Sequence, residues 1–250
     1  MFDDQAEFGE RFDWGEDGVR QLAPVADIVV VVDVISFTTA VDVAVGQGAT
    51  VYPYRQRDDA AAAFVRSAGA VLAGDREQPG LRTPYSLSPA SLMAIPAGTR
   101  LVLPSPNGAT LILLAAELGA TVLAGCLRNA AATAAACREQ SGSVAVVAAG
   151  ERWRQDGAMT GSLRPAVEDL VGAGAILAAL APTNPSPGAI AAIAAFHAAL
   201  PDLGRFLAAC ASGKELCGQG FAADVELAAQ LDVSQTILQF NNAAFAPQGR

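Results

Sequence analysis

A carboxylate and three hydroxyls follow one strongly apolar stretch of the chain. Ile28–Val32 is a run of β-branched residues, and Asp33 closes it before Ser36, Thr38 and Thr39. A run that is apolar on both faces is typical of a central strand in a parallel sheet covered by helices. Open α/β sheets bind ligands at the carboxyl ends of their strands, so this turn is the first candidate site. The same residue types also end strands and cap helices for local reasons, and both interpretations stay open for this turn alone.

Further acidic residues lie after predicted strands and in the first turn of a predicted helix. Carboxylates and hydroxyls, together with Asn and Arg, suit a hard cation and a phosphate group. Glu168 and Asp169 also lie where acids stabilise a helix dipole. Because adjacent helical residues diverge by about 100°, we expect one of these two to face a given site. The acidic candidates besides Asp33 are Asp75, Glu151, Glu168, Asp169 and Asp224.

Two predicted helix starts offer backbone N–H groups to an anion. They follow Ser36 and Asn107, and the free N–H groups of a helix start attract phosphate oxygens. Ser105–Gly108 is also a plain turn sequence, so this signal is weak by itself. The cations that we expect to complete such a pocket are Arg76, Arg128, Arg152 and Lys214.

Composition and charge narrow the classes of function. The chain has 250 residues, of which 52% are apolar and 16% charged, so a large core is expected. Its net charge of −9 argues against a nucleic-acid partner, since phosphate backbones need clustered Lys and Arg. The four cysteines form no CxxC pair, which favours free thiols in a reducing cytosol over zinc or disulfides. The single histidine, His197, lies in an apolar segment where packing is the expected role.

The sequence contains none of the common catalytic motifs and no targeting signal. GxSxG, Walker and GxGxxG patterns are missing, and the acidic N-terminal segment lacks the apolar region of a signal peptide. The alanine-rich segments 176–181 and 189–200 are too short and too interrupted by Pro and Gly to span a bilayer. We therefore expect a cytoplasmic protein without a membrane partner. A homodimer stays open, because these apolar helices could form an interface or close the core.

The hydrophobic pattern predicts strands and helices that alternate along the chain. An edge strand over 8–14 and a helix over 16–22 come first. The pattern then predicts strands over 28–33, 49–54 and 70–73, helices over 37–45 and 58–67, and an irregular segment over 74–96. It restarts with strands over 100–103, 121–124 and 144–148, helices over 109–118 and 129–139, and an irregular loop over 150–164. Helices over 166–180, 189–200, 203–211 and 221–231 and a strand over 236–240 complete it.

Short matches show that this restart is an internal repeat. Gly48–Val51 recurs 71 residues later as Gly119–Val122, and the same offset aligns Ser36 with Asn107. Other matches in the same order pair Thr39 with Thr110, Arg57 with Arg128, and Gly74–Arg76 with Gly150–Arg152. A co-linear series of this kind is stronger evidence than one match in a chain rich in Ala and Gly.

The predicted fold is a three-layer α/β/α domain with a mixed sheet, built by internal duplication from two similar βαβαβ halves. A single domain covers 1–250, with halves at about 25–98 and 99–165 and a C-terminal helical part at about 166–250. If the halves pack about a pseudo-twofold axis, their turns and acidic loops face one crevice. The halves differ at one key position, because Asp33 aligns with Pro104.

These stretches together resemble the 2-phosphosulfolactate phosphatase (ComB-like) family, whose members are magnesium-dependent phosphatases of an α/β fold made of two similar halves. The resemblance spans about 29–239 in family order. It is carried by Asp33-Val34-Ile35 with Thr38-Thr39, Gly74-Asp75-Arg76, Ser88-Pro89, Ser105-Pro106-Asn107-Gly108, Asn129, Ala149-Gly150, Glu168-Asp169 with Ala173-Gly174, and Gly220-Phe221 with Asp224.

The residues and the resemblance together predict a Mg²⁺-dependent hydrolase of a small anionic phosphate monoester. The expected catalytic residues are Asp33, Asn107 and Arg76. The expected metal ligands are Asp33, Asp75, Glu151, Glu168 and Asp169. The expected substrate-binding residues are Ser36, Thr38, Thr39, Ser88, Ser105, Gly108, Asn129, Arg152 and Lys214. Whether Asp33 holds the metal or attacks the phosphate stays open.

Two alternatives follow from departures at the site. Family members typically carry Arg where this chain has Ser36, a small residue at Phe37 and Asn at Leu87. A changed substrate, or a member that binds an anionic metabolite without hydrolysing it, is therefore one alternative. The other is a haloacid-dehalogenase-type phosphatase with Asp33 as nucleophile, although Ile35 stands where that class needs a second Asp.

Overall fold

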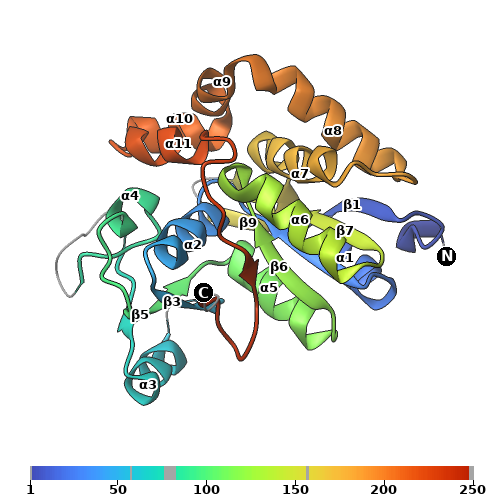
Figure 1. The fold of residues 1–250 in the computed structure, drawn as a ribbon. Helices are drawn as coiled ribbons and strands as arrows, with labels where there is room; N and C mark the ends of the chain where they lie inside the picture. The colour runs from blue at the N-terminus through green and yellow to red at the C-terminus, as the bar shows by residue number, and fades with distance from the viewer. Residues whose placement is uncertain (1, 57, 76–82, 156–157, 248–250) are drawn as a thin grey trace.

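The computed structural model of the chain describes residues 2–56, 58–75, 83–155 and 158–247. Within these ranges it describes every side chain except those of residues 154, 155 and 158–160. Two sheets made mostly of parallel strands lie between layers of helices, and further helices near the C-terminus cover one end (Figure 1). The predicted α/β class, with a mixed sheet and extra C-terminal helices, is confirmed.

The larger sheet is built around the apolar run that the sequence marks as central. Its order is β1 (Glu10–Trp14), β7 (Val144–Ala148), β2 (Ile28–Val32), β6 (Thr121–Gly125) and β10 (Leu238–Gln239). β10 is antiparallel to β6 and the other pairs are parallel. All five residues of β2 are buried, as a strand covered by helices on both faces requires.

The smaller sheet has the order β3 (Thr50–Tyr54), β5 (Arg100–Pro104) and β4 (Val71–Leu72), all parallel. The two sheets exchange the first strand of each repeat. β2, the first strand of the first repeat, lies between the second and third strands of the second, and β5 lies between the second and third strands of the first. Each first strand thus completes the sheet of the other repeat, which brings the turns after β2 and β5 together.

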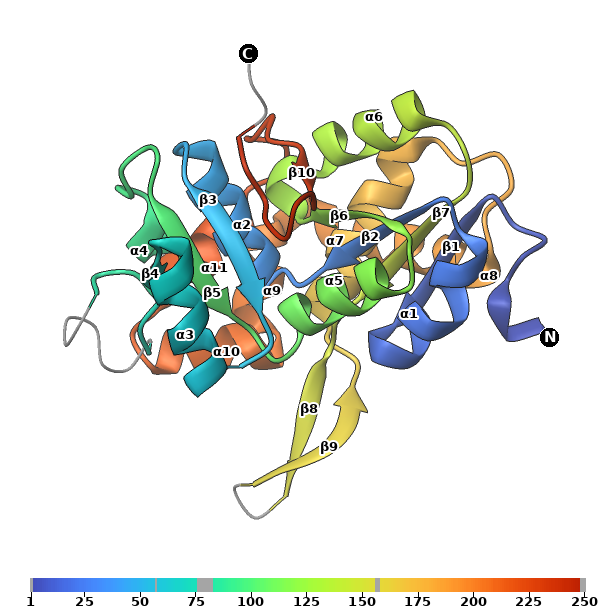
Figure 2. The same cartoon turned by 90° about the horizontal axis from the view of Figure 1, so that it is seen from below.

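Helices cover both faces of the larger sheet, because β2 is apolar on both sides. Val29 and Val31 pack with α1 (Gly15–Leu22), α2 (Phe37–Gly46) and α5 (Gly108–Glu117). Val30 and Val32 pack with α6 (Ala130–Gln140) and α7 (Val167–Leu180). Figure 2, seen from below, shows α1 and α5 in front of the sheet, α7 behind it and α6 along the top of the view.

The first of the C-terminal helices stacks on α7. α8 (Pro187–Ala199) approaches α7 so closely that a Cβ on Gly174 would lie 2.0 Å from the Ala192 carbonyl oxygen. The run Pro187–Ala209, which includes α8, is 23 residues long, with mean hydropathy 1.3. By length and apolar composition alone this run could cross a membrane. The sequence analysis predicted instead that segment 189–200 is too short to do so. Such a run is weak evidence, because an apolar helix of a soluble protein can have the same length and composition, and α8 rests on α7.

The remaining helices are short. They are α3 (Asp59–Ala68), α4 (Pro89–Leu92), α9 (Leu203–Ala209), α10 (Ala211–Gly218) and α11 (Ala222–Ala228), with 3-10 turns at Phe2–Asp4, Ala23–Val25, Leu127–Asn129 and Leu200–Asp202. α10 is not predicted by the sequence pattern. Ser212 and Gly213 in its first turn are weak helix formers, and the Cys210 sulfur caps it by accepting a hydrogen bond from the Gly213 N–H at 3.3 Å.

One predicted loop is wrong. Residues 150–164 contain a β-hairpin of β8 (Glu151–Gln155) and β9 (Ala158–Arg164), which projects from the body of the protein in Figure 2. The sequence carried the signal, because Asp156-Gly157 is a strong short-range hairpin marker between two strand-like segments. The other long segment, 74–96, contains α4.

Candidate functional site

Asp33 lies between the first residues of two helices that are related by the repeat. Its Oδ1 accepts a hydrogen bond from the Phe37 N–H at 3.2 Å, and its Oδ2 accepts one from the Gly108 N–H at 2.9 Å. Phe37 begins α2 and Gly108 begins α5, 71 residues later. The two helix starts that the sequence predicts as a phosphate cradle therefore both donate to the same buried carboxylate.

The Thr38 and Thr39 hydroxyls make hydrogen bonds with the backbone of their own turn, which follows β2. Thr38 Oγ1 accepts a hydrogen bond from the Asp33 N–H at 3.1 Å and donates to the Asp33 carbonyl at 2.8 Å. Thr39 Oγ1 donates to the Val34 carbonyl at 2.8 Å. Both Thr side chains are fully buried. In this structure they shape the turn that presents Asp33.

Asp169 joins the turn after β2 to the turn after β7. Its Oδ1 accepts a hydrogen bond from the Val34 N–H at 2.7 Å, and its Oδ2 accepts one from the Gly150 N–H at 2.9 Å. Val34 follows Asp33, and Gly150 precedes Glu151. A buried carboxylate held by two backbone N–H groups fixes the relative position of the two acidic residues beside them.

Glu168, next to Asp169 at the start of α7, faces a different environment. Its side chain is 1% exposed, and its Oε2 atom has no hydrogen-bond partner among the described residues. Cys210 lies close by, because the charge of Glu168 adds to burial in raising the pKa of the Cys210 thiol to about 12. Unpaired buried carboxylate oxygens are costly, so a ligand that contacts the Glu168 Oε2 atom would be favourable.

The acidic side chains are close enough to raise one another's pKa. Burial raises the pKa of Asp33 to about 7, and the charges of Glu151 and Glu168 add to the rise. Burial, then Asp33 and Glu168, raise the pKa of Asp169 well above its ordinary value. Burial also raises the pKa of Glu151, although a hydrogen bond from Asn107 opposes the rise. Neutralising this group takes either protons or a cation.

A cleft of about 700 Å³ opens beside Glu151, which lines it, whereas Asp33, Glu168 and Asp169 lie outside its lining. Asp75 and Glu151, which the repeat aligns, both line it, so the acidic loops of the two halves face one crevice as predicted. Within the second half, Asn107 Nδ2 donates a hydrogen bond to Glu151 Oε2 at 3.1 Å, which ties the turn after β5 to the start of β8. The full lining is Ile35, Asp75, Glu151, Arg152, Trp153, Arg164, Ala211, Ser212, Glu215, Leu216 and Gln219.

The comparison with protein families agrees with this geometry. A family model described as 2-phosphosulpholactate phosphatase matches residues 17–243, nearly the whole chain. The chain belongs to the 2-phosphosulpholactate phosphatase family. It is thus a phosphoric monoester hydrolase by family, and the predicted family and enzyme class are confirmed. A comparison with curated proteins finds no match.

Three polar residues that carry the resemblance found in the sequence make hydrogen bonds that hold separate elements together. Ser88 Oγ donates to Asp224 Oδ1 at 2.6 Å, and the Ala90 N–H donates to the same oxygen at 3.1 Å. Asp224 on α11 therefore anchors the start of α4. Asn129 accepts a hydrogen bond from the Cys126 N–H and donates to the Thr236 carbonyl, which ties the C-terminal segment to the repeat.

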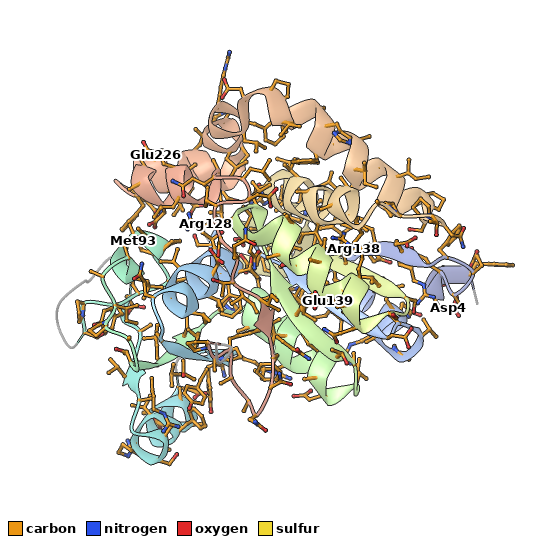
Figure 3. The ribbon with its side chains drawn as sticks, in the orientation of Figure 1. Asp4, Met93, Arg128, Arg138, Glu139 and Glu226 are labelled. Carbon is orange, nitrogen blue, oxygen red and sulfur yellow. The ribbon has the colours of Figure 1, made fainter. Side chains whose placement is uncertain are left out.

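The predicted cations are placed differently from one another. Arg128 pairs with the buried Asp42 at 2.8 Å and also donates to the Gln230 side chain, between α2 and α11 (Figure 3). Arg152 lines the cleft, whereas Lys214 is exposed and does not line it. Arg76 lies outside the described residues. The remaining predicted contacts, Ser36 and Ser105, are buried beside the turns after β2 and β5.

The sequence analysis did not predict that Arg164 and residues of α10 line the cleft. Arg164 ends β9, and Ser212 and Glu215 belong to α10. Both elements were absent from the predicted fold, which explains the omission. A regular hairpin around Asp156-Gly157 would have paired Glu151 with Ser162, whereas a register shift between Arg152 and Arg154 brings Arg164 opposite Glu151.

A divalent cation suits the kinds of donor present. The buried acids offer hard oxygen ligands, and Glu168 Oε2 is without a partner. Within the described residues, however, no three His, Cys, Asp or Glu side chains form a ready ligand group. The donor chemistry of the region fits a hard cation.

Proposed function

We propose that this family member is a Mg²⁺-dependent phosphatase of a small phosphate monoester that carries a second anionic group, and that it acts in the cytoplasm. The observation that carries the proposal is the buried Glu168 Oε2, without a hydrogen-bond partner in the described part of the chain, beside the mutually repelling Asp33, Glu151 and Asp169. Such a group favours a bound cation, since buried carboxylates are otherwise neutralised only by protons.

Asp33, Glu151 and Glu168 would hold the ion, with Asp75 at the edge of the cleft. The bound ion would neutralise charge on the phosphoryl oxygens. Asp169 also braces the site, because its two oxygens accept hydrogen bonds from the backbone N–H groups of Val34 and Gly150. The Asp33 oxygens are hydrogen-bonded in the same way, and each oxygen of both residues keeps a lone pair for the ion.

The chain's own side chains supply the remaining binding energy. Asn107 presents an amide next to Glu151, and Arg152 and Arg164 bring positive charge to the cleft wall. The Asn107 amide would stabilise charge that builds up on the phosphoryl oxygens in the transition state, whereas the two arginines would attract the second anionic group. The volume of about 700 Å³ is within the range of small-molecule pockets. An acidic chain with this cleft is suited to a small anion and not to a nucleic acid; a homodimer remains a proposal.

The test is phosphate release from a panel of small phosphate esters, with Mg²⁺ and then with excess EDTA. The proposal predicts release from esters that carry a second anion, loss of release in EDTA, and recovery when Mg²⁺ is restored. Release that is unchanged by EDTA would contradict the metal requirement. No release from any ester, by folded protein with Mg²⁺ present, would contradict the proposed activity.

A further inference from the structure

Arg164 stands between the carboxylates and the helical wall of the cleft. It ends β9, opposite Glu151 in the hairpin register, and its Nη2 donates to Ser212 Oγ on α10 at 3.4 Å. Its charge opposes the rise in the pKa of Glu151, so the guanidinium lies close to that acid. Arg164 therefore reaches from the acidic end of the cleft to α10.

Arg152 and Arg164 differ in the hydrogen bonds and ion pairs that they make with the rest of the protein. Arg152 Nη2 pairs with Glu16 Oε1 at 2.9 Å, and Arg152 Nη1 donates to the Gly161 carbonyl at 2.6 Å. The guanidinium of Arg152 is thus held by α1 and by the hairpin itself. Arg164 makes one long hydrogen bond to a hydroxyl within the described residues. A guanidinium has five N–H donors, so Arg164 retains most of its capacity for a ligand.

The walls around Arg164 suit a short carbon skeleton with an anionic end. Ile35 and Leu216 supply apolar surface, and Trp153, 53% exposed, supplies an aromatic face. The planar fork of Arg matches the oxygens of a carboxylate or sulfonate. The Ser212 hydroxyl beside it can donate to the same group. The phosphoryl group, by contrast, belongs with the cation at the carboxylates.

We propose that Arg164, assisted by Ser212, binds the second anionic group of the substrate, the one that is not released, and so determines which phosphate esters are hydrolysed. This inference rests on the proposed phosphatase function and adds the residue that selects the substrate class. Arg164 is a specificity residue in this account, and removing it should spare esters that lack the second anion.

The experiment compares two esters of nearly the same shape. 2-Phosphosulpholactate carries a carboxylate and a sulfonate, whereas glycerol 2-phosphate has neutral hydroxymethyl groups in their places. For Arg164→Gln, kcat/KM should fall about 100-fold with 2-phosphosulpholactate, the loss of a charge-assisted contact, and stay unchanged with glycerol 2-phosphate. Arg205→Gln, which removes the same charge from an exposed position on α9, should leave both values unchanged. An equal loss with both esters, or no loss, would overturn the inference.

A binding measurement separates this inference from the phosphatase proposal. Calorimetry with sulpholactate, which has no phosphate to release, should show binding to the wild type and about 100-fold weaker binding to Arg164→Gln. Arg164→Lys should fall between them, because it keeps the charge and loses the fork. If sulpholactate binds equally to wild type and Arg164→Gln, or does not bind the wild type, the inference is wrong. If it binds as expected while no ester is hydrolysed, the phosphatase proposal alone fails. Thermal unfolding of each variant checks the fold.

Discussion

The backbone N–H of Gly108 donates a hydrogen bond to the Oδ2 atom of Asp33 over 2.9 Å, across 75 residues of chain. The N–H of Phe37, which the repeat aligns with Gly108, donates to the other oxygen of the same carboxylate. Helix starts attract anions, and here the anion is a side chain. Asp33 is therefore the point at which the two repeats meet, and a substrate phosphate must bind elsewhere than at these two N–H groups.

Gly108→Ala should disturb the packing of residue 108 against Asp33 and Phe37. A Cβ at residue 108 would lie 2.7 Å from Asp33 Oδ2 and 2.5 Å from Phe37 Cδ1, and both neighbours are buried. We expect a loss of about 2 kcal/mol in the free energy of unfolding, together with reduced phosphate release, as overpacking a close contact typically costs. Chemical denaturation measures the first and a phosphate assay the second. Gly9→Ala is the control, because a Cβ there meets nothing within 4 Å. Equal stability of the two variants would contradict this packing account.

Stability in the absence of a divalent cation should fall as the pH rises through the range where Asp33 titrates. Burial raises the pKa of Asp33 from 3.8 to about 7, so the folded state binds this proton more tightly than the unfolded chain does. The stabilisation from Asp33 is complete below about pH 4 and is lost as the pH approaches about 7. Unfolding in EDTA from pH 4 to pH 8 measures the slope.

Asp33→Asn is the matched variant for that slope, since an amide does not titrate. Its unfolding free energy should depend less on pH than that of the wild type over this range. Added Mg²⁺ should weaken the dependence in the wild type, because a cation favours the charged carboxylate. Identical pH profiles for the two proteins in EDTA would show that Asp33 titrates normally.

Asp169→Asn tests the brace between the turns after β2 and β7. An amide offers one acceptor oxygen, so either the Val34 or the Gly150 N–H would face an NH₂ group and lose its partner. We expect a loss of about 2 kcal/mol in stability, the usual cost of a buried donor left unsatisfied. Phosphate release should also decrease, since Asp33 and Glu151 flank the two braced residues. Unchanged stability would show that the brace is dispensable.

Arg128→Ala tests whether this arginine serves the fold. Its guanidinium pairs with Asp42, which is 1% exposed and also accepts a hydrogen bond from Ser234 Oγ at 2.6 Å. Removing one partner of a buried pair leaves an uncompensated charge, and we expect a loss of about 3 kcal/mol. The double variant with Asp42→Asn should recover part of this loss. If Arg128→Ala is as stable as the wild type but binds sulpholactate more weakly, Arg128 belongs to the substrate site instead.

The sequence predicted the framework of the site because strong local patterns encode it. The apolar run before Asp33 is the central strand, and the repeat offset of 71 residues carries α2 onto α5 and β3 onto β6. Pairing Asp75 with Glu151 through the repeat correctly placed both residues at one cleft. These features depend on neighbouring residues or on similarity within the chain, which a single sequence displays.

Partners that depend on tertiary contacts were not predictable in the same way. The sequence indicates that Thr38, Thr39 and Arg128 are polar and suitably spaced for a ligand, but not that backbone groups and Asp42 already occupy them. The exchange of β2 and β5 between the sheets is likewise a property of strand pairing and not of either repeat alone. Arg164 was missed because the segment that contains β9 was assigned to a loop, and because a register shift that the sequence does not reveal brings it opposite Glu151.

The most direct test of the account is the initial rate of phosphate release by wild type and Asp33→Asn at saturating Mg²⁺, with 2-phosphosulpholactate as substrate. Circular dichroism and thermal unfolding first establish that both proteins are folded. The account predicts Mg²⁺-dependent release by the wild type and none above background by Asp33→Asn. Full activity of folded Asp33→Asn would contradict the assignment of the reaction to this cleft.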